Sequence, residues 1–127
     1  HTFGHAIETL AQRKRMESDD APDITHGEAV AMGMVLAAAL SDAYRRKNGG
    51  VLIREDGFEW GLEQRLEADF LSCGLPIGSP FKLSMMAEVM KKDKKAEGDK
   101  IHFVLPKFVG EVEIVDLTVE EVLALMS

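Results

Sequence analysis

The sequence has few of the residues that form disulfides or stack as aromatic rings. It contains one cysteine, Cys73, and aromatic residues make up only 6% of its 127 residues. A single cysteine cannot close an internal disulfide, so we expect an intracellular, cytoplasmic protein in which Cys73 is a small buried residue. Because the chain has seven methionines and few aromatics, its core should be mainly aliphatic and adaptable.

Basic residues are also fewer than acidic ones. The chain has 15 Lys and Arg against 22 Asp and Glu, which gives a net charge of −7. This balance argues against nucleic acid or an anionic membrane surface as the main partner. The longest apolar stretch, residues 29–39, is too short to cross a bilayer. An anionic small molecule remains compatible with the composition, because a few local lysines suffice to bind a phosphate.

The hydrophobic spacing predicts a mainly α-helical domain with one small β-hairpin. The expected helices cover residues 1–12, 26–47, 56–72, 83–95 and 118–126, and the expected strands cover 101–105 and 111–115. The polar stretch 13–25 is typical of an exposed loop. Thr25 with Glu28, and Thr118 with Glu121, have the spacing of capping boxes that begin the helices after them.

Three of the four histidines lie in two short segments, HTFGHAIE and HGEAVAMGM, which begin at His1 and His26. His1 and His5 are four residues apart, so on a helix they share a face and can point at one metal, or at a metal and its ligand. An isolated pair with this spacing is more often two ordinary helix-face histidines. Thr2 stands where the HExxH zinc proteases need glutamate, and Phe3 follows it, so that class is excluded.

Small residues follow His26 at several positions of the predicted helix: Gly27, Ala29, Ala31 and Gly33. Small side chains let two helices approach closely. The helix that begins at His26 can therefore pack tightly against the helix that carries His1 and His5, and bring the third imidazole near the first two.

Taken together, the two histidine segments resemble the 3-dehydroquinate synthase family. The resemblance continues over nearly the whole chain, in the same order, at Leu75-Pro76, at MKKDKK (residues 90–95) and at IHFVLPKFVGEVEI (residues 101–114). It implies that residues 1–127 are the metal- and substrate-binding helical C-terminal domain of a dehydroquinate synthase-like fold. Since the chain begins at His1 without a methionine, we expect a fragment, inactive alone, whose Rossmann-like NAD-binding domain lies upstream.

The resemblance also implies a set of site residues. The family holds a divalent metal, Zn²⁺ or Co²⁺, with two histidines and one glutamate. The histidines correspond to His1 and His26, and the glutamate is expected upstream. His5 corresponds to a catalytic, substrate-binding histidine, although support of a metal ligand through a hydrogen bond is the alternative role. A substrate-binding lysine corresponds to Lys94 or Lys95, which one sequence does not separate.

Neighbouring charged residues have plainer explanations. Lys91 and Lys92 fit a solvated helix end, where positive charge is favoured by the helix dipole. Glu28 fits a capping role, and His102 lies in a predicted strand, where a structural role is expected. The stretch between His5 and His26 is longer than is usual in the family. An insertion in a surface loop costs little stability, but it bears on the rim of the site and on substrate identity.

For the intact protein, the resemblance implies conversion of 3-deoxy-arabino-heptulosonate 7-phosphate to 3-dehydroquinate and phosphate, a step of the shikimate pathway in aromatic amino acid biosynthesis. The partner would be a phosphorylated sugar acid, with NAD as cofactor and a homodimer as the assembly. Two alternatives remain at this point. One is another sugar-phosphate cyclase, such as a 2-deoxy-scyllo-inosose or valiolone-type synthase, with glycerol dehydrogenases more distant. The other is a non-catalytic helical module that binds a partner.

Overall fold

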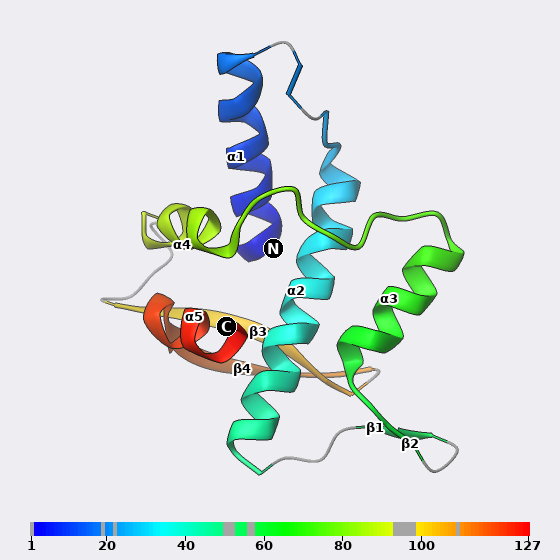
Figure 1. Ribbon diagram of the computed structural model, residues 1–127. Coiled ribbons are helices and arrows are strands. Elements are labelled where there is room, and N and C mark those ends of the chain that lie inside the picture. Colours follow the sequence, from blue (N-terminus) through cyan, green and yellow to red (C-terminus); the bar gives the residue numbers. More distant parts are fainter. Residues whose placement is uncertain are drawn as a thin grey trace.

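The computed structural model describes the backbone of residues 2–18, 20–21, 23–49, 53–55, 58–92, 99–108 and 110–127. Side chains are described for the same residues except 53–55, 58–60 and 108. Within these ranges the chain forms five helices and two antiparallel hairpins (Figure 1). The helices are α1 (Thr2–Glu17), α2 (His26–Lys47), α3 (Leu62–Ser72), α4 (Leu83–Lys91) and α5 (Val119–Met126); the strands are β1 (Ile53–Glu55), β2 (Phe58–Trp60), β3 (Lys100–Phe108) and β4 (Glu111–Thr118).

The mainly helical fold and the C-terminal hairpin are confirmed. The long helix α2 runs through the middle of the molecule, with α1 and α4 packed near its first half and the β3–β4 hairpin and α5 near its second half (Figure 1). None of the helices in the described ranges combines the length and hydrophobicity needed to cross a bilayer. The small β1–β2 hairpin was not predicted.

Helix α1 is longer than predicted. It continues to Glu17, although the sequence pattern indicated a loop from Arg13 onward. Arginine, lysine, methionine and glutamate all have high helix propensity, so a polar run of these residues can extend a helix into solvent. Lys14 and Arg15 lie in the last turn, where positive charge interacts favourably with the helix dipole.

Helices α1 and α2 meet at a glycine contact. A Cβ atom added to Gly33 would lie 2.8 Å from the backbone nitrogen of Gly4 and 3.1 Å from its Cα. A Cβ atom added to Gly4 would lie 3.4 Å from the carbonyl oxygen of Ala29. The two backbones therefore pack at a distance that leaves no room for a side chain at Gly33, as the small residues of the second histidine segment predicted.

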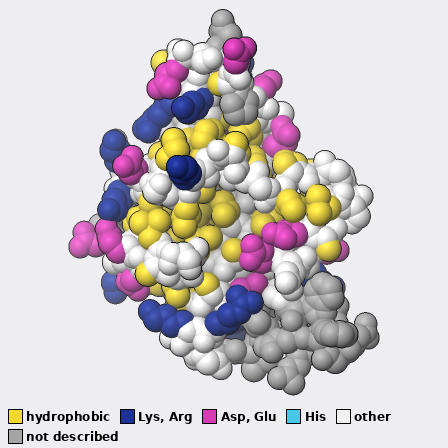
Figure 2. Space-filling model, viewed as in Figure 1, with side chains coloured by type: hydrophobic (Ala, Val, Ile, Leu, Met, Phe, Trp, Pro, Cys, Tyr) yellow, Lys and Arg dark blue, Asp and Glu magenta, His cyan; other side chains and the backbone are white. Residues whose placement is uncertain are grey.

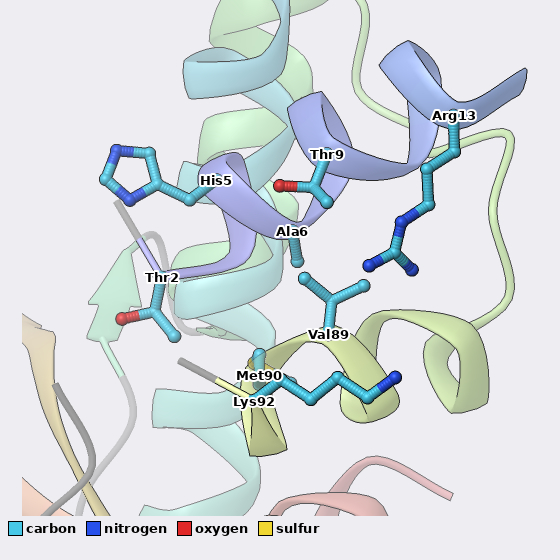
Figure 3. Close-up of a pocket in the computed structure, with 8 residues that line it drawn as sticks. All are labelled: Thr2, His5, Ala6, Thr9, Arg13, Val89, Met90 and Lys92. Atoms are coloured by element: carbon cyan, nitrogen blue, oxygen red, sulfur yellow. The ribbon is translucent and has the colours of Figure 1, made fainter. Parts of the chain in front are cut away.

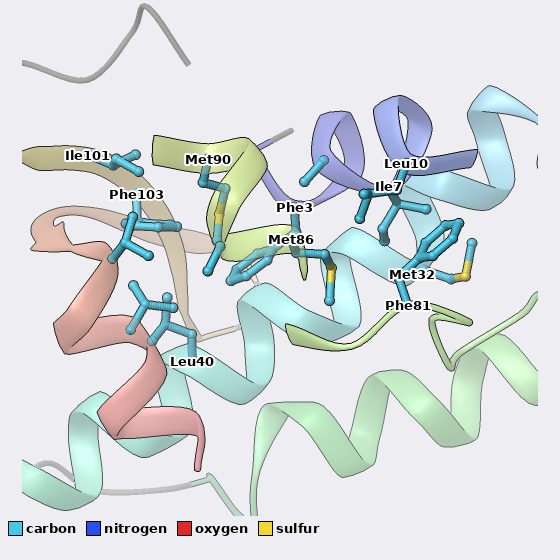
Figure 4. Packing of buried hydrophobic residues seen from close by; sticks show 14 of the residues in the cluster. Phe3, Ile7, Leu10, Met32, Leu40, Phe81, Met86, Met90, Ile101 and Phe103 are labelled. Atoms are coloured by element: carbon cyan, nitrogen blue, oxygen red, sulfur yellow. The ribbon is translucent and has the colours of Figure 1, made fainter. Parts of the chain in front are cut away.

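One hydrophobic core joins these helices to the C-terminal hairpin (Figure 4). Phe3 of α1 packs against Phe103 of β3, with ring centroids 5.8 Å apart. Met86 and Met90 bring α4 into the same cluster. Its largest fully buried apolar side chains are Ile7, Leu40, Met86, Met90, Leu105 and Val122. The adaptable, methionine-containing core expected from the composition is thus present, with phenylalanine at the junction between α1 and β3.

The β3–β4 hairpin is fastened to α2 by buried polar groups. The hydroxyl of Ser41 donates to the carbonyl oxygen of Pro106 at 2.5 Å, and the guanidinium of Arg45 donates to the same oxygen at 3.2 Å. Arg45 also pairs with Glu113 of β4 at 3.0 Å. The carbonyl of Pro106 thus has hydrogen-bond partners at the point where the strand register shifts, between Pro106 and Phe108. The same bonds fix the hairpin against α2.

Helix α3 begins later than the predicted residue 56, because its start is set by a distant residue. The carboxylate of Asp42, buried in α2, accepts hydrogen bonds from the backbone N–H groups of Leu62 and Glu63, each at 3.0 Å. A side chain at Gly61 would collide with this carboxylate. Residues 53–55 and 58–60 instead pair as β1 and β2.

Helix α3 ends at Ser72, as predicted, but the setting of the next residue differs from expectation. Cys73, expected to be buried, is exposed at the C-terminal end of α3. Its backbone N–H donates a hydrogen bond to the carbonyl oxygen of Asp69 and caps the last turn of α3. The residue therefore lies just after the helix, outside the core.

We predict that Gly33→Ala lowers the free energy of unfolding by about 1–3 kcal/mol, because overpacking forces the two backbones apart. Gly27→Ala is the matched control on the same helix, since a Cβ atom there meets nothing within 4 Å. Denaturant unfolding of both variants measures the difference. Equal stabilities of the two variants would contradict the close helix contact.

We also predict that Asp42→Ala destabilises the protein by about 1–3 kcal/mol, because two backbone donors at the start of α3 lose their partner in a buried setting. Asp69→Ala, at an exposed position of α3, is the control. The comparison is read from thermal or denaturant unfolding curves. An Asp42→Ala variant as stable as Asp69→Ala would show that the cap contributes nothing.

Candidate metal and substrate site

The site begins at the N-terminal end of α2, where a capping box fixes the first turn. The Thr25 hydroxyl accepts from the N–H of Glu28 at 3.2 Å, and the Glu28 carboxylate accepts from the N–H of Thr25 at 3.0 Å. The hydrogen bond from the Thr25 backbone is the main reason that the pKa of Glu28 is lowered. The capping role predicted for Glu28 is confirmed, and it makes His26 the first residue of α2.

A hydrogen bond joins His26 to α1. Nδ1 of His26 lies 3.0 Å from Oε1 of Glu8. An ionised carboxylate can accept a hydrogen bond but cannot donate one, so in this contact the hydrogen belongs to Nδ1. In the neutral form of the ring, the lone pair is then on Nε2. The His26 side chain is 65% exposed and that of Glu8 is 35% exposed. The imidazole is therefore held from one side by Glu8, while most of its side chain remains exposed.

His5 lies one turn before Glu8 on α1, at the edge of a cleft between α1 and α4. The cleft has a volume of about 390 Å³. It is lined by Thr2, His5, Ala6, Thr9 and Arg13 from α1 and by Val89, Met90 and Lys92 from the end of α4 (Figure 3). The wall of the cleft thus contains hydroxyl, apolar and cationic side chains, and the ring of His5 lies at one end of it, pointing away from Arg13 and Lys92 (Figure 3).

Basic side chains, with acidic ones among them, lie at the same edge of the molecule (Figure 2). On the face drawn in Figure 2, Lys and Arg side chains lie along the edge formed by α1 and α4, beside hydrophobic side chains in the centre. In Figure 3 the charged ends of Arg13 and Lys92 lie on the same side of the cleft. The cleft wall therefore carries two cationic side chains, which lie away from the ring of His5 (Figure 3).

The lysines of the MKKDKK segment divide between two settings. Lys91 pairs with Glu120 of α5, with Nζ and Oε1 2.8 Å apart. This pairing is the largest cause of the raised pKa of Lys91 and of the lowered pKa of Glu120. Lys92 lines the cleft, although the sequence favoured a solvated helix end for both residues. Both lysines are exposed to solvent, as predicted. Lys92 also adds positive charge to the wall of the cleft.

Three of the predicted site residues, His1, Lys94 and Lys95, lie outside the described residues. Among those that are described, no three His, Cys, Asp or Glu side chains gather closely enough to hold a metal ion. His102 lies on β3 and pairs with Asp116 across the hairpin.

Sequence reasoning overlooked Glu8, Arg13 and Lys92. Glu8 ends the first histidine segment and stands three residues after His5, so helical spacing already put the two on neighbouring positions of one face. That spacing was the available signal. The spacing did not show that His26 is the hydrogen-bond partner of Glu8, because that depends on how α1 and α2 are aligned. Arg13 was placed in a loop, and only the extra turn of α1 brings it to the cleft.

The chain is similar to known proteins over most of its length. Residues 1–96 match the family described as 3-dehydroquinate synthase C-terminal. The chain belongs to this family. Its similarity extends to proteins named 3-dehydroquinate synthase from Dictyoglomus thermophilum, with 40% identity over 91% of this chain, and from Dictyoglomus turgidum, with 38% over 91%. A protein of the same name from Thermococcus kodakarensis is 36% identical over 96% of this chain.

This member of the 3-dehydroquinate synthase C-terminal family spans 27% of the length of the two Dictyoglomus relatives and 28% of the Thermococcus one. The matched residues include both histidine segments and the whole cleft between α1 and α4. The family assignment therefore covers the parts of the chain on which the candidate site is built.

Proposed function

We propose that this chain is the metal- and substrate-binding part of a 3-dehydroquinate synthase. The intact protein would convert 3-deoxy-arabino-heptulosonate 7-phosphate to 3-dehydroquinate and phosphate, a carbon–oxygen lyase reaction of the shikimate pathway. The observation that carries the proposal is the packing of the two histidine segments against each other, through Gly4 and Gly33 and through the Glu8–His26 hydrogen bond. The names of the relatives support the same reaction.

The donor chemistry suits a zinc or cobalt ion. Glu8 holds Nδ1 of His26, which leaves Nε2 as the nitrogen that could bind a metal, and imidazole is a common ligand of both metals. His1 is the second proposed histidine ligand, and the third ligand would be a glutamate of the upstream domain. When bound, the metal would act as a Lewis acid toward a substrate oxygen. NAD, bound by that upstream domain, would supply a transient oxidation of a substrate hydroxyl that is later reversed.

The residues of this chain would bind and orient the substrate. His5, at the edge of the cleft, would hydrogen-bond a substrate hydroxyl and exchange a proton with it. Arg13 and Lys92 add positive charge to the cleft wall, and Lys94 or Lys95 would meet an anionic group of the substrate. We further propose a cytoplasmic homodimer as the working assembly, and no turnover by residues 1–127 alone, because NAD and one metal ligand would come from outside them.

We predict that His26→Ala removes most of the bound zinc from the intact protein, since a site with one of three ligands lost binds far more weakly. His102→Ala is the matched control, because that histidine lies on the hairpin and pairs with Asp116. Metal analysis after purification measures zinc per chain. Unchanged zinc in His26→Ala would reject the proposed ligand and favour a non-catalytic helical module.

We predict that His5→Ala retains zinc but lowers kcat/KM for the heptulosonate phosphate by ~100-fold or more, the usual range for loss of a proton-transfer group. The assay follows phosphate release by the intact protein with NAD and zinc. If the unmodified protein releases no phosphate from this substrate, the reaction itself is rejected and another sugar-phosphate cyclase becomes the better assignment. Loss of zinc in His5→Ala would instead make His5 a ligand.

A further inference from the structure

Glu8 is the one acidic side chain of α1 that contacts the proposed metal ligand of α2 in the described part of the chain. We infer that Glu8 is a positioning residue for the metal site: its carboxylate holds the ring of His26 so that Nε2 faces the metal. The inference rests on the proposed metal role of His26. It adds a role for a residue that neither binds the metal nor touches the substrate.

The hydrogen bond selects one tautomer of His26. Free neutral imidazole distributes its hydrogen between Nδ1 and Nε2, and only the nitrogen without hydrogen can bind a metal. Because the carboxylate of Glu8 is an acceptor, the 3.0 Å contact places the hydrogen on Nδ1. Nε2 then keeps the lone pair that a metal ligand needs. Histidine ligands in metalloproteins commonly donate their second N–H to a carboxylate in this way, and loss of such a partner weakens metal binding.

The backbone around Glu8 is rigid enough to make this contact effective. Ile7, one residue before Glu8, is fully buried in the core, and Leu10, two residues after it, is also buried. The Gly4–Gly33 contact sets the distance between the two helices one turn away. His26 is fixed in turn by the capping box of Thr25 and Glu28. Both partners of the bond therefore start from packed or capped backbone positions, so only their side chains have to be ordered to form it.

An ordinary surface ion pair is the competing explanation. With side chains 35% and 65% exposed, a Glu–His pair contributes little to stability. The two explanations differ in what they predict. A surface pair would change neither metal affinity nor the metal's coordination, whereas a positioning carboxylate acts on both and leaves folding stability nearly unchanged.

The test uses the intact protein with Glu8→Ala, Glu8→Gln and, as control on the same helix, Glu17→Ala, which removes an exposed carboxylate. Zinc affinity is measured by competition with a chromogenic chelator. Glu8→Ala should weaken zinc binding by about 10- to 100-fold. Glu8→Gln keeps an amide oxygen that accepts from Nδ1, so it should recover part of the loss. Glu17→Ala should bind zinc like the unmodified protein.

A second measurement separates positioning from a general loss of structure. In the cobalt-substituted protein, the visible absorption bands report the ligand geometry, and they should shift in Glu8→Ala but not in Glu17→Ala. Thermal unfolding of the metal-free variants should be similar for all three. Unchanged zinc affinity and unchanged cobalt bands in Glu8→Ala would overturn the inference, as would a drop in metal-free stability that accounts for the whole loss of affinity.

The His26→Ala variant distinguishes this inference from the function on which it rests. If His26→Ala keeps its zinc, the proposed ligand is wrong and Glu8 has no metal to orient. If His26→Ala loses zinc while Glu8→Ala binds it normally, the ligand assignment stands and only the positioning role fails. Loss of zinc from Glu8→Ala as complete as that from His26→Ala would identify Glu8 as a ligand itself and would also overturn the positioning role.

Discussion

The contact between Gly4 and Gly33 is the constraint on which the rest of the site depends. It sets the separation of α1 and α2, with no space for a side chain at position 33. Because α1 carries both His5 and Glu8, any change in this separation would move the cleft wall and the His26 partner together. The close helix contact therefore sets where the α1 side of the cleft and the Glu8 carboxylate lie relative to α2, although neither glycine lines the cleft.

Buried polar groups attach the other elements to α2. Ser41 and Arg45 hold the β3–β4 hairpin, and Asp42, between them in sequence, holds the start of α3. These three residues lie within two turns of one helix and face different neighbours. Each satisfies backbone groups that a purely apolar helix would leave without partners. The hydrophobic core buries most of the apolar surface. These three polar side chains determine where α3 begins and how the β3–β4 hairpin is aligned with α2.

Local signals in the sequence predicted part of this architecture. The capping boxes of Thr25 and Thr118 placed the starts of α2 and α5 correctly, because such bonds form within three residues. The predicted start of α3 was wrong, because the actual start is set by Asp42, which is 20 residues away from Leu62 in the sequence. The end of α1 was also wrong, because charged residues with high helix propensity resemble a loop in composition. Of the proposed site, His5 and His26 are on neighbouring helices as expected, whereas His1, Lys94 and Lys95 stay predictions.

The connection between α1 and α2 has a consequence for how this part of the protein can vary. Both ends of the connection are anchored independently of its length: α1 by the core and the glycine contact, and α2 by its own capping box. The start of α2 therefore depends on Thr25 and Glu28 and not on the number of residues before them. Relatives can differ in the length of this connection and still keep His26 in the same place relative to α1. A change of length there is accordingly compatible with an unchanged contact between His26 and Glu8.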